Sequence, residues 1–532
     1  MKTLRPGLLV VGIVLVLALA AWPVLLRWTK EVSAPETVVL RVAHMSLDPP
    51  VHRAFDALAA EFQKTHPHVR IKQMPVPQRL YRTWLSTQLI GGTPPDIVEV
   101  PPWSAAEDVL PYFEELGDEL HRPNPANAGT ELADVPWHET FVNGLRDQPN
   151  FYEAVLGYYS VPMSVITLRL VYNRELLEQT YGFAHPPRTV SELAQQCAAI
   201  EARNRATGER VVPLVVSGWK ATSLLQSIPR SHTAGLAAEI DVLHAGWNWD
   251  DERSVAYLRN RWSLESREIR ESLKQMRQLG RHFPPGFQAV TDGDAVFPFM
   301  QGQAVFYIAL SGEYTTLLSQ CDFPLGVTLI PRADAEGASE VAEGNLISMA
   351  SLGLTRQSPH RELALEFLRF ATSRAGNAMF SAESQWLPGV RGLPTEEKLA
   401  GFAASTSGNP PGFSPWLLSD PDLNLFLNQN LHHLLGRDGS VEAFEDVLQP
   451  AYPSLVAGGM RRFIRKSNLL LQRLDLALAA RDRIQAGADD TAVQQDEADH
   501  LFEVEVITTL RIAYMQHGLR EAEVSTASKP GQ

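Results

Sequence analysis

Basic residues are scarcer than acidic ones in this chain of 532 residues. Lys and Arg number 47 against 61 Asp and Glu, which gives a formal net charge of −14. A nucleic-acid-binding protein needs clustered Lys and Arg to neutralise phosphates. The charge balance therefore argues against a nucleic-acid partner.

Cysteine is also scarce, since Cys197 and Cys321 are the two in the chain. Two cysteines are too few for a disulfide framework, and they cannot form a zinc site alone. Cys197 falls on the apolar side of a predicted helix, which favours a buried thiol. A disulfide between the two is the alternative, and it requires that the fold bring them together.

Short catalytic motifs are absent. The sequence contains no Gly-x-Ser-x-Gly, no His-Glu-x-x-His, no Walker loop and no Gly-x-Gly-x-x-Gly after a strand. Its 15 histidines are not grouped with the spacing of metal ligands. We therefore expect no catalytic residue, no metal and no cofactor. A glycosidase-type pair of carboxylates stays open, because acidic residues are numerous.

The longest apolar run lies at the N-terminus, over residues 8–26, and it follows Lys2 and Arg5. Such a run is typical of a secretory signal peptide or of an uncleaved membrane anchor. The small residues at 18–20 offer a cleavage site, whereas the tryptophans and basic residues at 22–30 resemble an interfacial flank. Under either interpretation, residues 1–30 direct the rest of the chain out of the cytoplasm.

A β-α-β-α-β pattern follows the N-terminal segment. Strands are predicted at 38–45, 69–76 and 96–100, and apolar residues on one helix face predict helices at 51–67 and 78–90. This alternation predicts an α/β fold with a mainly parallel sheet covered by helices. The length of the chain predicts two or more domains.

Five segments stand out in their order along the chain: "FQKTHPHVRIK", "GGTPPDIVEV", "YYSVPMSVITLRLVYNRELLEQTYGFAHPPRTVSEL", "FMQGQAVFYIALSGEY" and "SPHRELALEFLRFATSRAGNAMF". Together they resemble the extracellular solute-binding proteins of bacterial ABC importers, the group that includes maltose-binding protein and other sugar binders. The resemblance spans about residues 38–455. No single motif is very specific, and the ordered set carries the assignment.

The resemblance implies a type II periplasmic-binding-protein fold, with two lobes of mainly parallel sheets joined by crossing strands and closed by hinge motion. Lobe 1 is expected at 38–164 and 344–386, and lobe 2 at 165–343 and 387–460. A helical C-terminal extension, 461–532, exceeds the usual family ending. Its basic first half and acidic second half favour a helical hairpin, and docking on a permease or an anionic membrane is the alternative.

The implied function is that of a non-enzymatic, exported binding protein. It captures a carbohydrate between its lobes and delivers it to the permease subunits of an ABC importer in the cytoplasmic membrane. We expect a monomer in the periplasm, anchored to the membrane if residues 1–30 are retained. Two alternatives are a membrane-anchored sensor domain and a glycan-active enzyme.

Candidate ligand-binding residues lie beyond predicted strand ends, where crevices of such sheets form. Sugars stack their C–H faces on aromatic rings and need polar partners for their hydroxyls. The aromatic candidates are Trp103, Trp219 and Tyr314, and the polar candidates are His44, Glu313 and Asn345. The resemblance implies stacking for Trp219 and Tyr314 in particular. For each residue, packing inside the protein is the competing interpretation.

Three further positions complete the expected site. Asp96 stands at the start of its strand, away from the carboxyl ends, and is expected to be a structural turn residue. Relatives often carry a polar residue where this chain has Ile166 and an aromatic one where it has Ala43. The pocket is therefore expected to fit a different or larger ligand.

Overall fold

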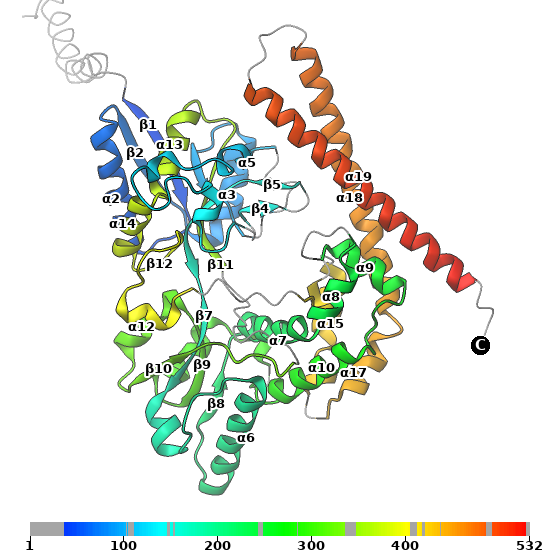
Figure 1. Cartoon of the computed structure of the whole chain (residues 1–532). Helices are drawn as coiled ribbons and strands as arrows, with labels where there is room; N and C mark the ends of the chain where they lie inside the picture. The colour runs from blue at the N-terminus through cyan, green and yellow to red at the C-terminus, as the bar shows by residue number, and fades with distance from the viewer. Residues whose placement is uncertain are drawn as a thin grey trace, which may run out of the picture.

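Two lobes lie one above the other in the computed structural model, with a long helical hairpin beside them (Figure 1). The residues described are 37–102, 104, 111–145, 149–152, 155–242, 248–284, 286–335, 347–404, 412–417, 421–436, 438–485 and 492–527. The expected targeting segment, residues 1–30, lies outside them. Within these ranges, no helix combines the length and the apolar character needed to cross a membrane.

Lobe 1 is built on the larger sheet, in which six described strands follow the order β12-β6-β11-β3-β1-β2. The strands are β1 (Val38–His44), β2 (Val69–Pro75), β3 (Ile97–Glu99), β6 (Val161–Ile166), β11 (Ile347–Leu354) and β12 (Leu387–Pro388). Successive side chains of β1 point to opposite faces, so Val42 and Ala43 belong to two different apolar clusters. A short hairpin of β4 (Phe151–Tyr152) and β5 (Gly157–Tyr158) lies beside this sheet.

Helices cover both faces of the larger sheet. On one face lie α2 (Pro49–Thr65), α13 (Arg361–Ala371) and α14 (Arg374–Ser384), and on the other lies α3 (Gln78–Ile90). Helix α2 buries the apolar stripe that its sequence spacing predicts, including Val51, Phe55 and Leu58.

Lobe 2 is built on the smaller sheet, with the order β10-β7-β9-β8. The strands are β7 (Leu168–Asn173), β8 (Val212–Val215), β9 (Ala304–Leu310) and β10 (Leu325–Thr328). One apolar cluster contains residues of α6 (Val190–Thr207), α7 (Gly218–His232) and α10 (Arg267–Gly280), and the opposite cluster contains residues of α11 (Asp292–Met300) and α12 (Ser311–Gln320). Further helices extend lobe 2: α8 (Ala234–Ile240), α9 (Asp250–Leu258), α15 (Pro421–Asn430), α16 (His432–Leu435) and α17 (Val441–Leu448).

The prediction of mainly parallel sheets is wrong, because both sheets are mixed. The parallel pairs are β1 with β2, β1 with β3, and β8 with β9, whereas β11 runs antiparallel to β3 and β6, and β9 to β7. The crossings explain the difference. The chain leaves the larger sheet along β6, passes through Thr167 into β7, and re-enters the sheet along β11 in the opposite direction.

Asp96 is a structural residue, as its position predicts. Its side chain is buried, accepts a hydrogen bond from the backbone N–H of Arg41 at 2.8 Å, and accepts another from the hydroxyl of Ser358 at 2.7 Å.

The two cysteines are both free thiols, and Cys197 is buried. The buried-thiol interpretation of Cys197 is therefore the correct one.

The C-terminal extension forms a helical hairpin of α18 (Tyr452–Gln485) and α19 (Ala492–Ala527), packed together beside the lobes (Figure 1). One ion pair between the two helices, Arg461 with Glu523 at 2.9 Å, lies on the surface. The main anchor is the buried Arg511 of α19, which donates two hydrogen bonds to Asp251 of α9 at 3.0 and 3.1 Å and covers the ring of Trp249.

The hairpin belongs to the apolar clusters of both lobes. Near its base, Met460 and Met515 join the large cluster of lobe 2. Farther along, Leu474 and Val504 join the lobe 1 cluster that contains Tyr81. Helix α18 also begins at Tyr452, so lobe 2 passes into the extension without a break in the helix.

Two buried ionisable side chains, His44 and Glu99, lie at the ends of the paired strands β1 and β3. The ring of His44 stacks on Phe55 at 4.7 Å, and burial is the main cause that lowers its pKa to about 4. Glu99 accepts a hydrogen bond from the backbone N–H of Met45 at 2.6 Å, and burial is the main cause that raises its pKa to about 7. At neutral pH His44 is therefore uncharged, whereas Glu99 is only partly ionised.

These two pKa shifts affect stability with opposite signs. Between about pH 4 and 6.5 the unfolded chain binds a proton at His44 that the folded chain does not, so stability falls on acidification. Between about pH 4.5 and 7 the unfolded chain loses a proton at Glu99 that the folded chain keeps, so stability falls as the pH rises. In their common range the two effects partly cancel.

Glu99→Gln removes only the second effect. We expect the free energy of unfolding of this variant, relative to the parent, to increase by up to about 3 kcal/mol from pH 4.5 to pH 8. Urea denaturation across this pH range measures the difference. Glu61→Gln, at an exposed pair with Lys64, is the control and leaves the pH profile unchanged. Equal profiles for Glu99→Gln and the parent contradict the prediction.

Arg511→Met leaves the buried carboxylate of Asp251 without its cation. We expect a loss of about 3–5 kcal/mol in the stability of the docked hairpin, and recovery of most of it in Arg511→Met/Asp251→Met, because an apolar pair replaces the buried charges. Arg461→Met breaks an exposed pair and costs less than about 1 kcal/mol. Hydrogen exchange of the α19 amides measures all three, and an equal effect of the two single substitutions contradicts the anchor.

Candidate functional site

The carboxyl ends of several strands face the space between the lobes. Because β6 continues into β7, it points toward lobe 2, and β1 and β3 run in the same direction as β6. In lobe 2, β9 is antiparallel to β7 and β8 is parallel to β9, so both run back toward lobe 1. Residues that directly follow β8 and β9 are therefore placed near the junction, where ligand crevices of α/β folds form.

Trp219 follows β8 on the first turn of α7, and its side chain is 43% exposed. The helix begins at Gly218 for a steric reason. A Cβ at this position would lie 2.3 Å from the carbonyl oxygen of Gln288, in the short helix η4 (Phe287–Ala289). Glycine thus allows α7 to start directly against η4, which fixes where Trp219 leaves the backbone.

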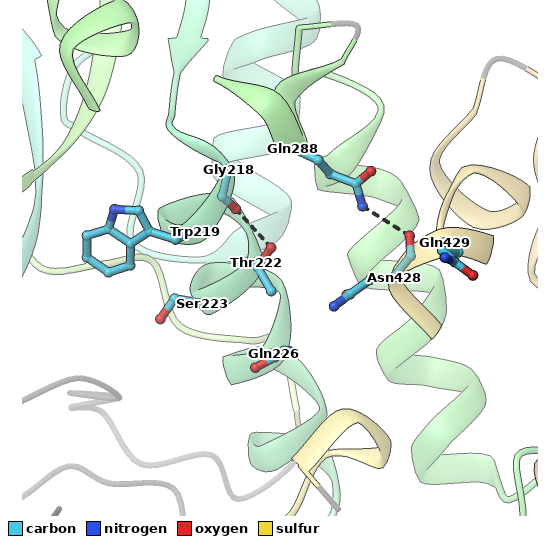
Figure 2. A pocket seen from close by; sticks show the side chains of 8 residues that line it. All are labelled: Gly218, Trp219, Thr222, Ser223, Gln226, Gln288, Asn428 and Gln429. Carbon is cyan, nitrogen blue, oxygen red and sulfur yellow. Dashed lines mark hydrogen bonds between the residues drawn. The ribbon is translucent and has the colours of Figure 1, made fainter. Parts of the chain in front are cut away.

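A hollow of about 530 Å³ lies between α7, η4 and α15 (Figure 2). It is lined by Gly218, Trp219, Thr222, Ser223, Gln226, Gln288, Asn428 and Gln429. None of these eight side chains carries a charge. The polar ones are hydroxyls and amides, and an amide offers both donors and an acceptor. The lining can therefore both donate hydrogen bonds to an uncharged polar molecule and accept them from it.

The lining residues have distinct positions in Figure 2. The side chain of Asn428 points toward Thr222 and Gln226, while the indole of Trp219 projects from the other side of the start of α7. The side-chain N–H of Gln288 donates to the backbone carbonyl of Asn428 at 3.1 Å, which ties η4 to α15. The side-chain oxygen of Asn428 is buried and has no hydrogen-bond partner. Trp219 thus belongs to the lining at the start of α7, but its indole points away from the amides, and the side-chain oxygen of Asn428 is enclosed by the protein.

Charged groups lie behind the indole. The N–H of Trp219 donates to both oxygens of Asp292, at 3.0 and 2.9 Å. The ammonium of Lys220, whose side chain is fully buried, lies 3.4 Å from Asp292 and 2.7 Å from Glu313. Burial alone raises the pKa of Asp292, but its hydrogen bonds and the Lys220 charge outweigh burial and lower the pKa below its usual value. Asp292 is therefore ionised at neutral pH.

Glu313 and Tyr314 follow β9 on the first turn of α12, as their positions predict. Glu313 accepts hydrogen bonds from Lys220, from the hydroxyl of Tyr307 and from the backbone N–H of Leu310. These contacts within lobe 2 occupy its carboxylate. The ring of Tyr314 contacts Phe402 and is 7% exposed. Trp219 thus offers far more free aromatic surface than Tyr314.

Of the remaining candidates, His44 is the one that the structure describes, and it does not line the hollow. His44 lies inside lobe 1, fully buried, with its Nε2 at 3.1 Å from the side-chain oxygen of Gln73. Its surroundings are those of a packed core histidine. Trp103 and Asn345 lie outside the described residues, and their ligand roles stay predictions.

Most of the lining was not identified from the sequence. Thr222 and Gln226 follow Gly218 at intervals of four residues, so their shared helix face is readable in the sequence once α7 is recognised. Gln288 and Asn428 are 60 or more residues away along the chain and belong to segments without any distinctive motif. Only the fold brings them beside α7.

Several solved structures are similar to this chain. RafE from Streptococcus pneumoniae, in its apo form, is 17% identical and has a TM-score of 0.54, covering 79% of this chain and 99% of that one. The GacH receptor of Streptomyces glaucescens is 18% identical, with a TM-score of 0.52 over 79% and 98%. A chitin oligosaccharide binding protein is 16% identical, with a TM-score of 0.53 over 80% and 100%. At these identities the likeness is one of fold, which is that of type II periplasmic binding proteins.

Sequence comparison is more specific about the family. No curated protein matches the chain. The family model described as "Bacterial extracellular solute-binding protein" matches residues 57–402, which include both sheets apart from the first strand. Because this match spans more than half of the chain, the protein belongs to the family of bacterial extracellular solute-binding proteins.

Proposed function

We propose that the protein captures a carbohydrate between its two lobes and delivers it to the permease of an ABC importer. The observation that carries the proposal is the half-exposed ring of Trp219 beside a hollow whose lining residues carry no charge. Its family is one of binding proteins and is non-catalytic.

The chemistry of the lining matches that of a sugar. A pyranose presents C–H groups on its faces, which pack on a flat aromatic ring, and hydroxyls around its edge, which both donate and accept. The amides of Gln226, Gln288 and Asn428 can donate a hydrogen bond to a hydroxyl or accept one from it. An ionic solute would instead require a buried counter-charge, and no lining residue supplies one.

The solved relatives agree with this ligand class. One is described as a chitin oligosaccharide binding protein, and the GacH receptor has been solved in complex with acarbose. Their low identity to this chain means that they support the class of ligand and not its identity.

Hinge motion at the crossing strands is the proposed means of capture. The link between β6 and β7 is the single residue Thr167, whose hydroxyl donates to the carbonyl of Phe402 at 2.7 Å. Rotation about such a short connection moves one lobe toward the other without unfolding either sheet.

The same proposal includes location in the periplasm, a monomeric state and anchoring through residues 1–30.

A thermal-shift panel tests the ligand class. Raffinose, maltotetraose, a chitin oligosaccharide and other glycans are compared with amino acids, peptides and organic acids on residues 31–532. A true ligand at 100 times its Kd stabilises the folded state by about 2.7 kcal/mol, so at least one glycan is expected to raise Tm. A rise with another solute class and with no glycan contradicts the carbohydrate assignment.

Trp219→Ala tests the stacking role. Loss of an aromatic platform is expected to weaken binding of the glycan found in the panel about tenfold or more, while Tm of the empty protein stays nearly unchanged because the ring is half exposed. Phe297→Ala, at an aromatic residue of α11 that is 55% exposed and does not line the hollow, is the matched control. A large loss of Tm in Trp219→Ala would identify the ring as a packing residue.

A further inference from the structure

We propose that Asp292 and Lys220 are positioning residues, which hold the indole of Trp219 in one orientation so that only its ring surface is available to a ligand. The inference rests on the proposed carbohydrate site and adds to it the residues that prepare the aromatic platform. Neither residue lines the hollow itself.

The indole N–H is already fully used. It is the one polar group of a tryptophan side chain, and it lies 3.0 and 2.9 Å from the two oxygens of Asp292. A ligand hydroxyl that approaches Trp219 therefore finds no donor there, and the ring contributes through its apolar faces. This arrangement suits the C–H surface of a sugar better than a hydrogen-bond acceptor.

Asp292 is itself held by a buried cation. The ammonium of Lys220 lies 3.4 Å from Asp292, 2.7 Å from Glu313 and 2.9 Å from the hydroxyl of Tyr307. A buried ammonium is stable only when it is paired, so the position of Lys220 is strongly specified. The position of Asp292, and through it the direction of the indole, follows from this network.

The orientation of the Trp219 ring in the empty protein affects the affinity for a ligand. A half-exposed tryptophan without a partner loses rotational freedom when a ligand stacks on it, and this ordering weakens affinity. The hydrogen bond to Asp292 restricts the ring in the empty protein instead. The network from Tyr307 to Trp219 thus explains why a fully buried lysine stands next to an exposed aromatic residue.

The first test measures the ring without any ligand. The protein is labelled with 5-fluorotryptophan, and Trp219→Phe assigns the Trp219 resonance among the 11 tryptophans. Asp292→Ala is expected to shift and sharpen that resonance, whereas Asp292→Asn, whose amide oxygen still accepts from the indole, keeps it near its original position. Asp294→Asn, two residues along the same helix and bonded to Thr291, is the control. An unchanged Trp219 resonance in Asp292→Ala overturns the proposal.

The second test measures affinity for raffinose, maltotetraose and a chitin oligosaccharide by calorimetry. For each sugar that the parent binds, Asp292→Ala is expected to weaken binding about 2- to 10-fold, the cost of ordering one side chain. Asp292→Asn recovers the affinity to within about twofold of the parent, and Asp294→Asn does not alter it. Equal weakening by Asp292→Ala and Asp292→Asn overturns the proposal, because it assigns the effect to charge and not to ring orientation.

The two tests separate this inference from the proposed function. If the parent binds none of the sugars of the thermal-shift panel, the carbohydrate assignment fails, and the fluorine spectra still decide whether Asp292 holds the ring. Asp292 is the preferred position for substitution because its side chain is 41% exposed, so its removal leaves no buried cavity. Substitution of Lys220 would leave two carboxylates facing each other without a cation and would affect folding.

Discussion

The direction of the crossing strand governs the rest of the structure. Strand β6 leaves lobe 1 and continues through Thr167 as β7 of lobe 2, so the chain enters the second sheet pointing away from the first. The neighbouring strands β8 and β9 run the opposite way to β7 and therefore end at the junction. The first turns of α7 and α12 follow these two ends, and they carry Trp219 and Glu313. If β7 ran in the opposite direction with the same pairing, β8 and β9 would end at the outer side of lobe 2, and both residues would lie there.

The charged groups beside Trp219 pair with one another and do not line the hollow. Lys220 is fully buried between Asp292 and Glu313, and the surface that remains is made of amides, hydroxyls and one indole. A buried ammonium needs at least one carboxylate, and here it has two. Because these charged groups pair with one another, the lining presents only neutral hydrogen-bonding groups and one ring to an uncharged solute. The pairing with Lys220 also explains why Glu313, a ligand candidate by its position after a strand, makes its contacts inside the protein.

Local patterns predicted the elements of lobe 1 well, and they failed for sheet direction. The stripe of Val51, Phe55 and Leu58 identifies helix α2, because burial on one helix face imposes its own spacing on the sequence. The alternation that identifies β2 is just as local. Sheet direction depends instead on β11, which is separated from β3 by about 250 residues and pairs with it antiparallel. Neither strand has a local sequence pattern that identifies its partner, so the first β-α-β-α-β stretch, whose own pairs are parallel, led to the wrong prediction of a mainly parallel sheet.

The site was predictable to the extent that it depends on strand ends. Trp219 could be found because it follows an apolar strand and a glycine, and the steric need for Gly218 beside Gln288 is part of the same turn. His44 is the last residue of β1, yet it is buried on Phe55, because the same rule cannot tell which strand-end side chains turn inward. The amides of Gln288 and Asn428 carry no sequence pattern at all, since hydrogen bonding of neutral groups imposes no spacing along the chain. Their meeting depends on Phe287–Ala289 and α15 packing against α7, which is a property of the assembled lobe. Position at a strand end thus selects candidates, and only the contacts each side chain makes decide whether it faces a ligand or the interior.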